Sequence, residues 1–458
     1  MKVSALKIDI TPDGAIDLTG DIYRRRFAEK IHSPLYGRML MLDDGERRII
    51  IVALDITIVS DKPADRIRAA LAEITGSADN VMVHATQTHN APSIGKFLMD
   101  ESIPLPPEAE FMRGTCDSYT SWLVEKVVEN AKKLPSMLRE VKMFSGRAIE
   151  GRYSFNRRGV FLDNGVFMPR NGNWVENDHP DEYLRFVEGP IDPEVGAIGF
   201  VDESGKTVAM ILHHTCHPVC TFPQNIISSD WPGAWCANVE KLYPEATALV
   251  LNGCCGNINP WNPYSPVPTT DCAEMGAALT DATKRIIERH GKELRDGALS
   301  VEMNVLDIDF RMPEAEEIGD RIEYYNAHPD VEWTEFGKVV NIKWVLAANN
   351  VGLLNSLKRR GKMHYGLQLF RVGDCAILGM PGEPFVEAQI KLKQLSPAAL
   401  TMCVHNINQY VGYIPNLPAF EHPAGQRGHE ANFSTWSNLQ HEALGIITDA
   451  AAKMVIRN

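Results

Sequence analysis

The chain has 458 residues, of which 44% are hydrophobic and 23% are charged, as in ordinary globular proteins. Its formal net charge of −13 argues against a nucleic-acid partner, which would need a basic surface. The first residues lack the apolar core of a signal peptide, and no stretch approaches the roughly 18 apolar residues of a membrane span, so we expect a cytoplasmic protein.

The first part of the chain predicts strands and helices in alternation. Residues 49–55 form a continuous β-branched run, typical of a strand covered on both faces. An amphipathic helix is predicted after Ser60 and a second strand over 81–86, so these elements indicate a βαβ unit with parallel strands. Residues 117–133 predict a further amphipathic helix.

The pattern becomes irregular between about 137 and 195, where Arg, Asn, Gly and Pro dominate. Regular structure returns with a predicted hairpin, whose strands cover 196–201 and 207–213. A helix, a strand and a helix are predicted next, over 233–242, 248–252 and 270–290.

The last part of the chain begins with mostly helical, charged residues at 313–360, where we expect a helical insertion. A hairpin is predicted across Gly373-Asp374. It is followed by a helix after Pro384, a strand over 401–406 and a C-terminal helix over 436–456. This alternation predicts an α/β fold with a mixed β-sheet flanked by helices.

Six polar clusters follow predicted strands, where ligands of α/β sheets usually bind. Each has a structural interpretation, because a histidine after a strand is often only hydrogen-bonded and a glutamate before a helix often only faces the helix dipole. Together they supply imidazoles, a carboxylate and room for water, as a catalytic zinc site requires. The clusters cover 84–92, 213–218 with 225–233, 252–262, 379–385, 409–416 and 426–432.

The nine cysteines are odd in number and most lie in apolar runs, so we expect reduced, buried thiols. Cys254 and Cys255 belong to a polar cluster and are rivals for the role of nucleophile. Free thiols in such surroundings are more often inert, which disfavours a thiol mechanism.

The order of these motifs resembles the neutral/alkaline non-lysosomal ceramidase family, in its N-terminal catalytic domain. The similarity begins at Asp9-Ile10-Thr11-Pro12, continues through residues 32–45 and 51–55, and reaches Gly-Tyr-Ile-Pro at 412–415. It implies the family's α/β fold and a single catalytic domain over 1–458. The family's additional C-terminal β-rich domain is not expected.

In that family, two histidines, a glutamate and a tyrosine hold a zinc ion. His217 matches the second histidine, and its neighbours His213 and His214 are alternatives. Glu383 matches the carboxylate and Tyr413 matches the metal-binding tyrosine.

The sequence departs from the family at two important places. Gln87 occupies the position of the first zinc-binding histidine, and His89, on the same face of an extended strand, is its expected substitute. The serine nucleophile of the family is replaced by Asn259. The resemblance therefore implies Zn2+ held by His89, His217, Glu383 and Tyr413, without ceramide hydrolysis.

Four further side chains are candidates for catalysis. Arg157 matches the family's substrate-pocket arginine, and with Asn259 it would stabilise a developing oxyanion. Asp230, His89 and His429 are the alternatives for a general base.

The resulting hypothesis is a zinc-dependent hydrolase of a polar amide, ester or carbohydrate-derived small molecule, in which zinc activates the attacking water. The preference for a polar substrate comes from the loop at 160–190, with its residues Asn171, Asn173, Trp174 and Asn177. A metal-assisted sugar lyase or isomerase and a non-catalytic metal-containing binding protein are the alternatives. Homo-oligomerisation stays open.

Overall fold

Two packed β-sheets form the centre of the computed structural model, which describes residues 1–168, 184–265, 270–290, 292–293 and 298–457. The larger sheet has the strand order β16-β14-β13-β8-β1-β5-β6-β7, with β18 also paired to β8. Its strands are β1 (Lys2–Asp9), β5 (Tyr36–Asp43), β6 (Arg48–Leu54), β7 (Val81–Ala85), β8 (Arg139–Ile149), β13 (Glu194–Asp202), β14 (Thr207–His214), β16 (Thr247–Asn252) and β18 (Lys292–Glu293). The smaller sheet contains, in order, β19 (Leu299–Ile308), β22 (Met363–Val372), β23 (Cys375–Gly379) and β25 (Leu400–Val404).

Alternate residues of a strand explain why both faces of the large sheet are buried. In β5, Met39 and Met41 belong to the core shared with the helices α1 (Asp61–Thr75) and α2 (Asp117–Ala131), whereas Leu40 and Leu42 belong to the core between the two sheets. A strand that is covered on both sides needs apolar residues at every position, so it reads as a continuous hydrophobic run.

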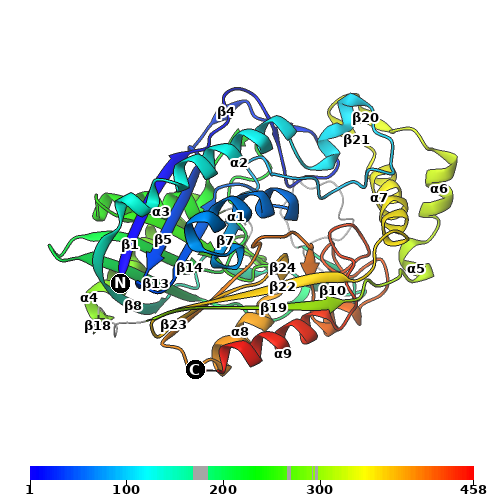
Figure 1. Cartoon of the computed structure of the whole chain (residues 1–458). Coiled ribbons are helices and arrows are strands. Elements are labelled where there is room, and N and C mark those ends of the chain that lie inside the picture. Colours follow the sequence, from blue (N-terminus) through cyan, green and yellow to red (C-terminus); the bar gives the residue numbers. More distant parts are fainter. Residues whose placement is uncertain (169–183, 266–269, 291, 294–297, 458) are drawn as a thin grey trace.

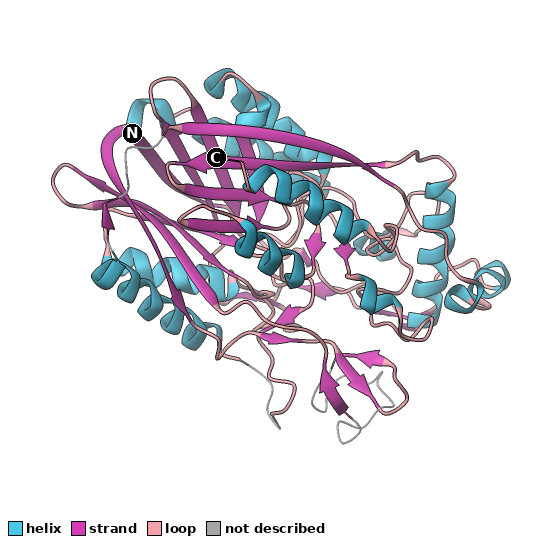
Figure 2. Ribbon diagram, turned by 90° about the horizontal axis from the view of Figure 1, so that it is seen from below, coloured by secondary structure: helices cyan, strands magenta, loops and turns pink. Residues whose placement is uncertain are grey.

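Three pairs of helices cover the outer faces of the two sheets (Figure 1). The large sheet is covered by α1 (Asp61–Thr75), α2 (Asp117–Ala131), α3 (Asp230–Leu242) and α4 (Cys272–His290). The small sheet is covered by α8 (Val386–Leu395) and α9 (Ala443–Val455). Figure 2 shows the molecule from the side of the small sheet and its helices. The expected α/β fold is confirmed.

The predicted pairings are confirmed as well. Strands β6 and β7 are parallel and α1 connects them, so the βαβ unit forms as predicted. The antiparallel pairs β13–β14 and β22–β23 are the two predicted hairpins.

Two predictions of secondary structure were wrong. Residues 137–195 were predicted to be irregular, but they contain β8, which lies in the middle of the large sheet. Its buried Val141 and Met143 alternate with exposed Lys142, as in a strand. The C-terminal helix begins at Ala443 rather than at 436. The preceding residues instead pair with the segment that directly follows β19, with backbone hydrogen bonds such as the one from Arg311 to Asn438.

Residues 309–362 connect β19 to its direct neighbour β22 in the small sheet. This connection contains α5 (Ala315–Ile318), α6 (Arg321–Ala327), the short strands β20 (Trp333–Glu335) and β21 (Val339–Val340), and α7 (Ile342–Leu357). The elements gather at one end of the molecule, where Trp344 is fully buried against the segment around Met99 (Figure 1). We propose that this connection is the insertion within one catalytic domain that the sequence indicates.

Short strands in the loops complete the fold. They are β2 (Asp17–Leu18), β3 (Arg26–Phe27), β4 (Lys30–Ile31), β9 (Phe155–Asn156), β10 (Gly159–Phe161), β11 (Val166–Phe167), β12 (Leu184–Val187), β15 (Ile226–Ile227), β17 (Ile258–Asn259), β24 (Glu383–Pro384) and β26 (Tyr413–Ile414). Among the described residues, no helix has the length and hydropathy needed to cross a membrane. Eight of the nine cysteines are buried, Cys116 is partly exposed, and none forms a disulfide, as the sequence predicts.

Candidate active site

The candidate site forms where loops from both sheets meet, at the carboxyl ends of β7, β14, β16, β23 and β25. Backbone hydrogen bonds join these loops: the amide of His217 donates to Ile258, and the amide of Gly256 donates to Pro384. Gly256 is required at this contact, because a Cβ atom there would lie 2.4 Å from the backbone oxygen of Glu383. Polar residues from distant parts of the chain are thereby brought together.

A cavity of about 450 Å³ opens at this meeting point. Six of the eight predicted site residues line it, together with Gln87: they are His89, Arg157, Asn259, Glu383, Tyr413 and His429. His217 lies directly behind the wall, with its ring fully buried. The cavity therefore brings together most of the predicted site residues, although these span more than 300 positions of the chain.

The side chains of Glu383 and Tyr413 are adjacent because the short strands β24 and β26 pair in parallel and place these two residues opposite each other. The turn before Glu383 depends on Gly382, whose φ of 72° is in the left-handed region. Tyr410, which the sequence analysis did not select, donates a hydrogen bond from its hydroxyl to Oε1 of Glu383 at 3.0 Å. Its place in the same polar cluster as Tyr413 was the only signal for it.

Nε2 of His217 lies 3.1 Å from Oε2 of Glu383. Nδ1 of His217 lies 2.6 Å from the carbonyl oxygen of Cys255, so Nδ1 carries the ring proton and Nε2 presents a lone pair when the ring is neutral. Burial lowers the pKa of His217, which favours this neutral ring. The contact with Glu383 is then satisfied only by a proton or a metal ion between the two atoms.

The carboxyl group of Glu383 is ionised in this setting. Burial alone would raise its pKa. A proton shared with Nε2 of His217 makes that nitrogen a hydrogen-bond donor, and this bond, together with one from Gln87, outweighs burial and holds the pKa of Glu383 below its ordinary value. An ionised carboxylate beside an imidazole whose other nitrogen donates to a carbonyl is the arrangement that metal-binding histidines usually show. The donor chemistry of this pair therefore fits a zinc ion.

His89 and Gln87 occupy different positions relative to this pair. The ring of His89 meets the ring of His217 edge-on, with centroids 5.7 Å apart, and its Nδ1 faces Gly20. Gln87 is buried, has a φ of 72° and makes a side-chain hydrogen bond with Glu383. Among the described residues, no three His, Cys, Asp or Glu side chains converge closely enough to hold a metal, so the substitution of His89 for the missing histidine stays a prediction.

Arg157 is held by hydrogen bonds on every nitrogen of its guanidinium group. Nε donates to Glu430 at 2.7 Å, Nη1 to Asn259 at 3.2 Å, and Nη2 to the backbone oxygen of Gly256 at 2.8 Å. Nη2 also lies 3.3 Å from Nε2 of His429. The charge of Arg157 thus lies at a fixed position in the cavity wall, beside the ring of Tyr413.

Glu430 anchors this arrangement and was not selected from the sequence, although the cluster 426–432 contains it. Its carboxylate is buried and bridges Nε of Arg157 and Nη1 of Arg158, the latter at 3.1 Å. It also lies 3.5 Å from Nδ1 of His429. Glu430 therefore pairs with two buried arginines, of which Arg158 also pairs with Glu188, and it contacts the one predicted catalytic histidine that is exposed.

Three predicted residues lie away from the cavity. Asp230, proposed as a general base, is buried at the start of α3, where its carboxylate accepts hydrogen bonds from Thr221 and from the amide of Trp231. It does not line the cavity, because these bonds direct its carboxylate toward Thr221 and the start of α3. His213 and His214, the alternatives to His217, contact the carbonyl oxygens of Leu251 and Glu194 instead.

The remaining wall of the cavity is largely apolar and aromatic, which the sequence analysis did not predict. It is formed by Tyr23, Phe97, Phe167, Phe222, Trp261, Leu346, Phe433 and Trp436, among others. The residues Asn171, Asn173, Trp174 and Asn177, from which a polar substrate was expected, lie outside the described residues.

The two rival thiols do not reach the cavity. Cys254 and Cys255 are fully buried, and burial raises the pKa of both thiols well above the ordinary value. Sγ of Cys255 faces the ring of His405 and the amide oxygen of Gln87. Neither thiol lines the wall of the site, so the geometry agrees with inert, buried cysteines.

Comparison with solved structures identifies the fold. No protein-family model matches the sequence. The neutral ceramidase from Pseudomonas aeruginosa superposes with a TM-score of 0.71 at 18% sequence identity, over 99% of this chain and 74% of that one. A ceramidase complexed with C2 superposes with a TM-score of 0.70 at 17% identity and the same coverage. This chain therefore has the neutral ceramidase fold, in which two layers of sheet lie between layers of helix and the polar loops lie at one end.

Proposed function

We propose that the protein is a zinc-dependent hydrolase of an amide or ester bond in a small molecule. The observation that carries this proposal is the contact between Nε2 of His217 and the carboxylate of Glu383 in the wall of a cavity, a pair that needs a cation or a proton between them. His217 and Glu383 are the proposed first ligands, and Tyr413 and His89 complete the set. When bound there, zinc polarises the scissile carbonyl and activates water for attack.

The protein's own residues position the substrate and stabilise charge. Oδ1 of Asn259 accepts a hydrogen bond from Arg157, and its amide nitrogen donates to Sδ of Met168 at 3.2 Å. A second hydrogen on that nitrogen would donate toward an oxyanion. Arg157 adds a fixed positive charge at the same wall. His429 and His89 are the remaining candidates for a general base, because Asp230 does not reach the cavity.

The lining of the cavity supports a substrate with one polar part and one apolar part. Its polar end carries Arg157, Asn259 and His429, and suits the reacting group and polar atoms beside it. The aromatic wall suits an apolar or ring-containing group. The proposal therefore keeps the polar reacting end expected from the sequence and adds an apolar portion.

Hydrolysis assays test the proposal. Purified protein should hydrolyse members of a panel of amides and esters, and a chelator should remove this activity until zinc is restored. Replacing both Cys254 and Cys255 by Ser should leave most of the hydrolytic activity. Ceramide should not be hydrolysed, because Asn259 stands where the resembled family has its nucleophilic serine. An acyl group trapped on a cysteine, or activity that withstands chelation, would exclude this mechanism.

Gln87→His is expected to tighten zinc binding by about tenfold or more, because an imidazole nitrogen would replace an amide beside Glu383. Histidine tolerates the positive φ of this position better than most residues do. Competition with a fluorescent chelator measures the affinity. Gln87→Leu, which fills similar space without a ligand atom, is the matched control and should not tighten binding. Equal affinities of the wild type and Gln87→His would place the metal elsewhere.

A further inference from the structure

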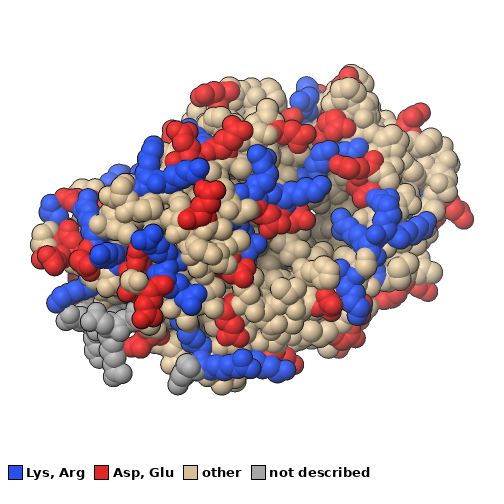
Figure 3. Space-filling model, in the orientation of Figure 1, with Lys and Arg blue, Asp and Glu red and all other residues tan. Residues whose placement is uncertain are grey.

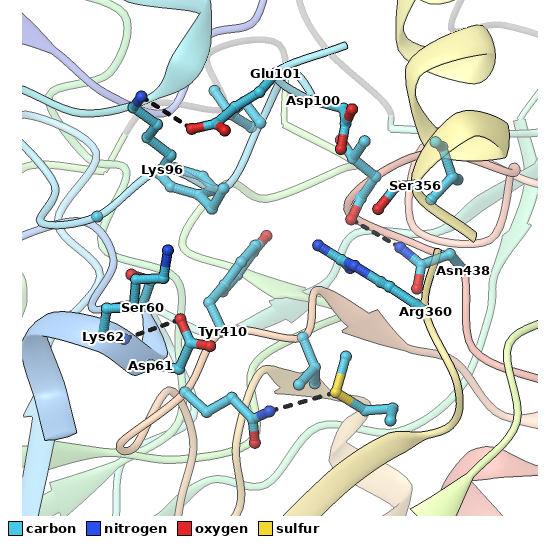
Figure 4. A pocket seen from close by; sticks show the side chains of 18 of the residues that line it. Ser60, Asp61, Lys62, Lys96, Asp100, Glu101, Ser356, Arg360, Tyr410 and Asn438 are labelled. Atoms are coloured by element: carbon cyan, nitrogen blue, oxygen red, sulfur yellow. Dashed lines mark hydrogen bonds and ion pairs between the residues drawn. The ribbon is translucent and has the colours of Figure 1, made fainter. Parts of the chain in front are cut away.

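A second and larger cavity, of about 990 Å³, adjoins the candidate active site. It lies between the start of α1, the loop that follows β7 and the segment that leaves α7 (Figure 4). Phe97, Leu98 and Tyr410 line both cavities, so the two share one wall. We refer to this second cavity as the basic cleft.

Basic side chains predominate in the basic cleft although the whole chain has a net charge of −13. Six of them line it: Lys62, Arg66, Lys96, Arg359, Arg360 and Lys362. Four carboxylates line it too, those of Asp61, Asp100, Glu101 and Asp117. Figure 3 shows Lys and Arg side chains on both sides of a hollow between α1 and the segment after α7.

Half of these cations are already neutralised by carboxylates. The pairs are Lys96–Glu101 at 3.0 Å, Arg359–Asp100 at 3.1 Å and Lys362–Asp309 at 3.1 Å. Within the described part of the chain, the charged groups of the other three, Lys62, Arg66 and Arg360, form no ion pair. Elsewhere on α1, Arg68 has two carboxylate partners, Asp65 and Asp79.

Two of these three cations repel each other. Lys62 and Arg66 are one helical turn apart on the same face of α1, and like charges at this spacing destabilise a helix unless something neutralises them. Arg360 lies beyond the end of α7, next to Arg359, whose charge is balanced by Asp100. Because walls of low dielectric concentrate the field inside a cleft, a bound anion would be attracted more strongly here than on an open surface.

We propose that the basic cleft binds a small multivalent anion bearing phosphoryl or carboxylate groups. Lys62 and Arg360 lie on opposite sides of the cleft, with Tyr410 between them, so one ligand that engages both needs more than one charged group (Figure 4). Arg and Lys form their strongest hydrogen bonds with such oxygens. Since Tyr410 also donates to Glu383, the ligand would lie directly behind the candidate active site. This site is independent of the proposed hydrolysis.

Calorimetric titration with pyrophosphate and, separately, with citrate tests the proposal on the full chain. At least one probe should bind with one site per chain. Tighter binding of pyrophosphate would indicate a phosphoryl ligand, and tighter binding of citrate would indicate a carboxylate ligand. The double variant Lys62→Gln/Arg360→Gln should weaken binding by about tenfold or more, because two charge-assisted contacts are lost.

The matched control is Lys132→Gln/Lys453→Gln, which removes the same charge from two exposed positions outside the cleft. It should bind the probe as the wild type does. If a probe bound only by chelating the metal, the cleft substitutions would not weaken its binding. The titration therefore tests anion binding in the basic cleft separately from the proposed hydrolysis. The proposal is overturned if neither probe binds in the millimolar range, or if both double variants weaken binding equally.

Discussion

His217→Ala is expected to lower the affinity for zinc by at least about a hundredfold, because it removes the nitrogen that faces Glu383. The wild type should be purified with about one zinc per chain, the stoichiometry of a single catalytic site. Elemental analysis after dialysis measures the content, and competition with a chelator measures the affinity. Glu383→Gln should cause a similar loss, because an amide is a weaker ligand than a carboxylate.

The control for this experiment is His364→Ala. His364 is exposed on β22 and pairs with Asp307; it lines the basic cleft but not the active-site cavity, so its replacement should leave the metal content unchanged. Circular dichroism would verify that each variant is folded. Full zinc occupancy in folded His217→Ala protein would show that the metal site has been assigned to the wrong residues.

Glu430→Gln is expected to destabilise the folded protein at pH 7 by about 3 kcal/mol, because it leaves the buried charge of Arg157 without its carboxylate partner and leaves Arg158 with Glu188 alone. Urea unfolding gives the free energy of unfolding of the wild type and the variant. Glu421→Gln replaces an exposed glutamate nearby and should change stability by less than about 0.5 kcal/mol. A change equally small for Glu430→Gln would contradict the bridging role.

The effect of Glu430→Gln should depend on pH. Although burial opposes ionisation, the charges of His429, Arg157 and Arg158 lower the pKa of Glu430 from 4.5 to about 2. A carboxyl group whose pKa is depressed on folding stabilises the protein above its unfolded pKa, and loses that effect as the pH falls through the folded value. The difference between wild type and variant should therefore be constant from pH 7 to about 5, and decrease between about pH 4.5 and 2. Urea titrations at pH 7, 5 and 3 would show this.

Local sequence patterns determined the secondary structure where one periodicity dominates. The β-branched run of β6, the stripe of α1 and the turn between β22 and β23 were predictable, because each depends on neighbours within a few residues. The same patterns located the site loops, since polar residues after buried strands are exposed to ligands. Strand β8 was missed because its charged residues hide the alternation of Val141 and Met143.

Tertiary structure alone decided how the site residues face one another. The contact between Arg157 and Glu430 joins residues 273 positions apart, and that between His217 and Glu383 joins residues 166 apart. Asp230 follows a polar segment before a helix, as Glu383 does, yet hydrogen bonds from Thr221 and Trp231 hold its carboxylate outside the cavity. The direction of a loop side chain follows from the backbone pairing of distant segments, such as β24 with β26, and this pairing leaves no periodic pattern in the sequence.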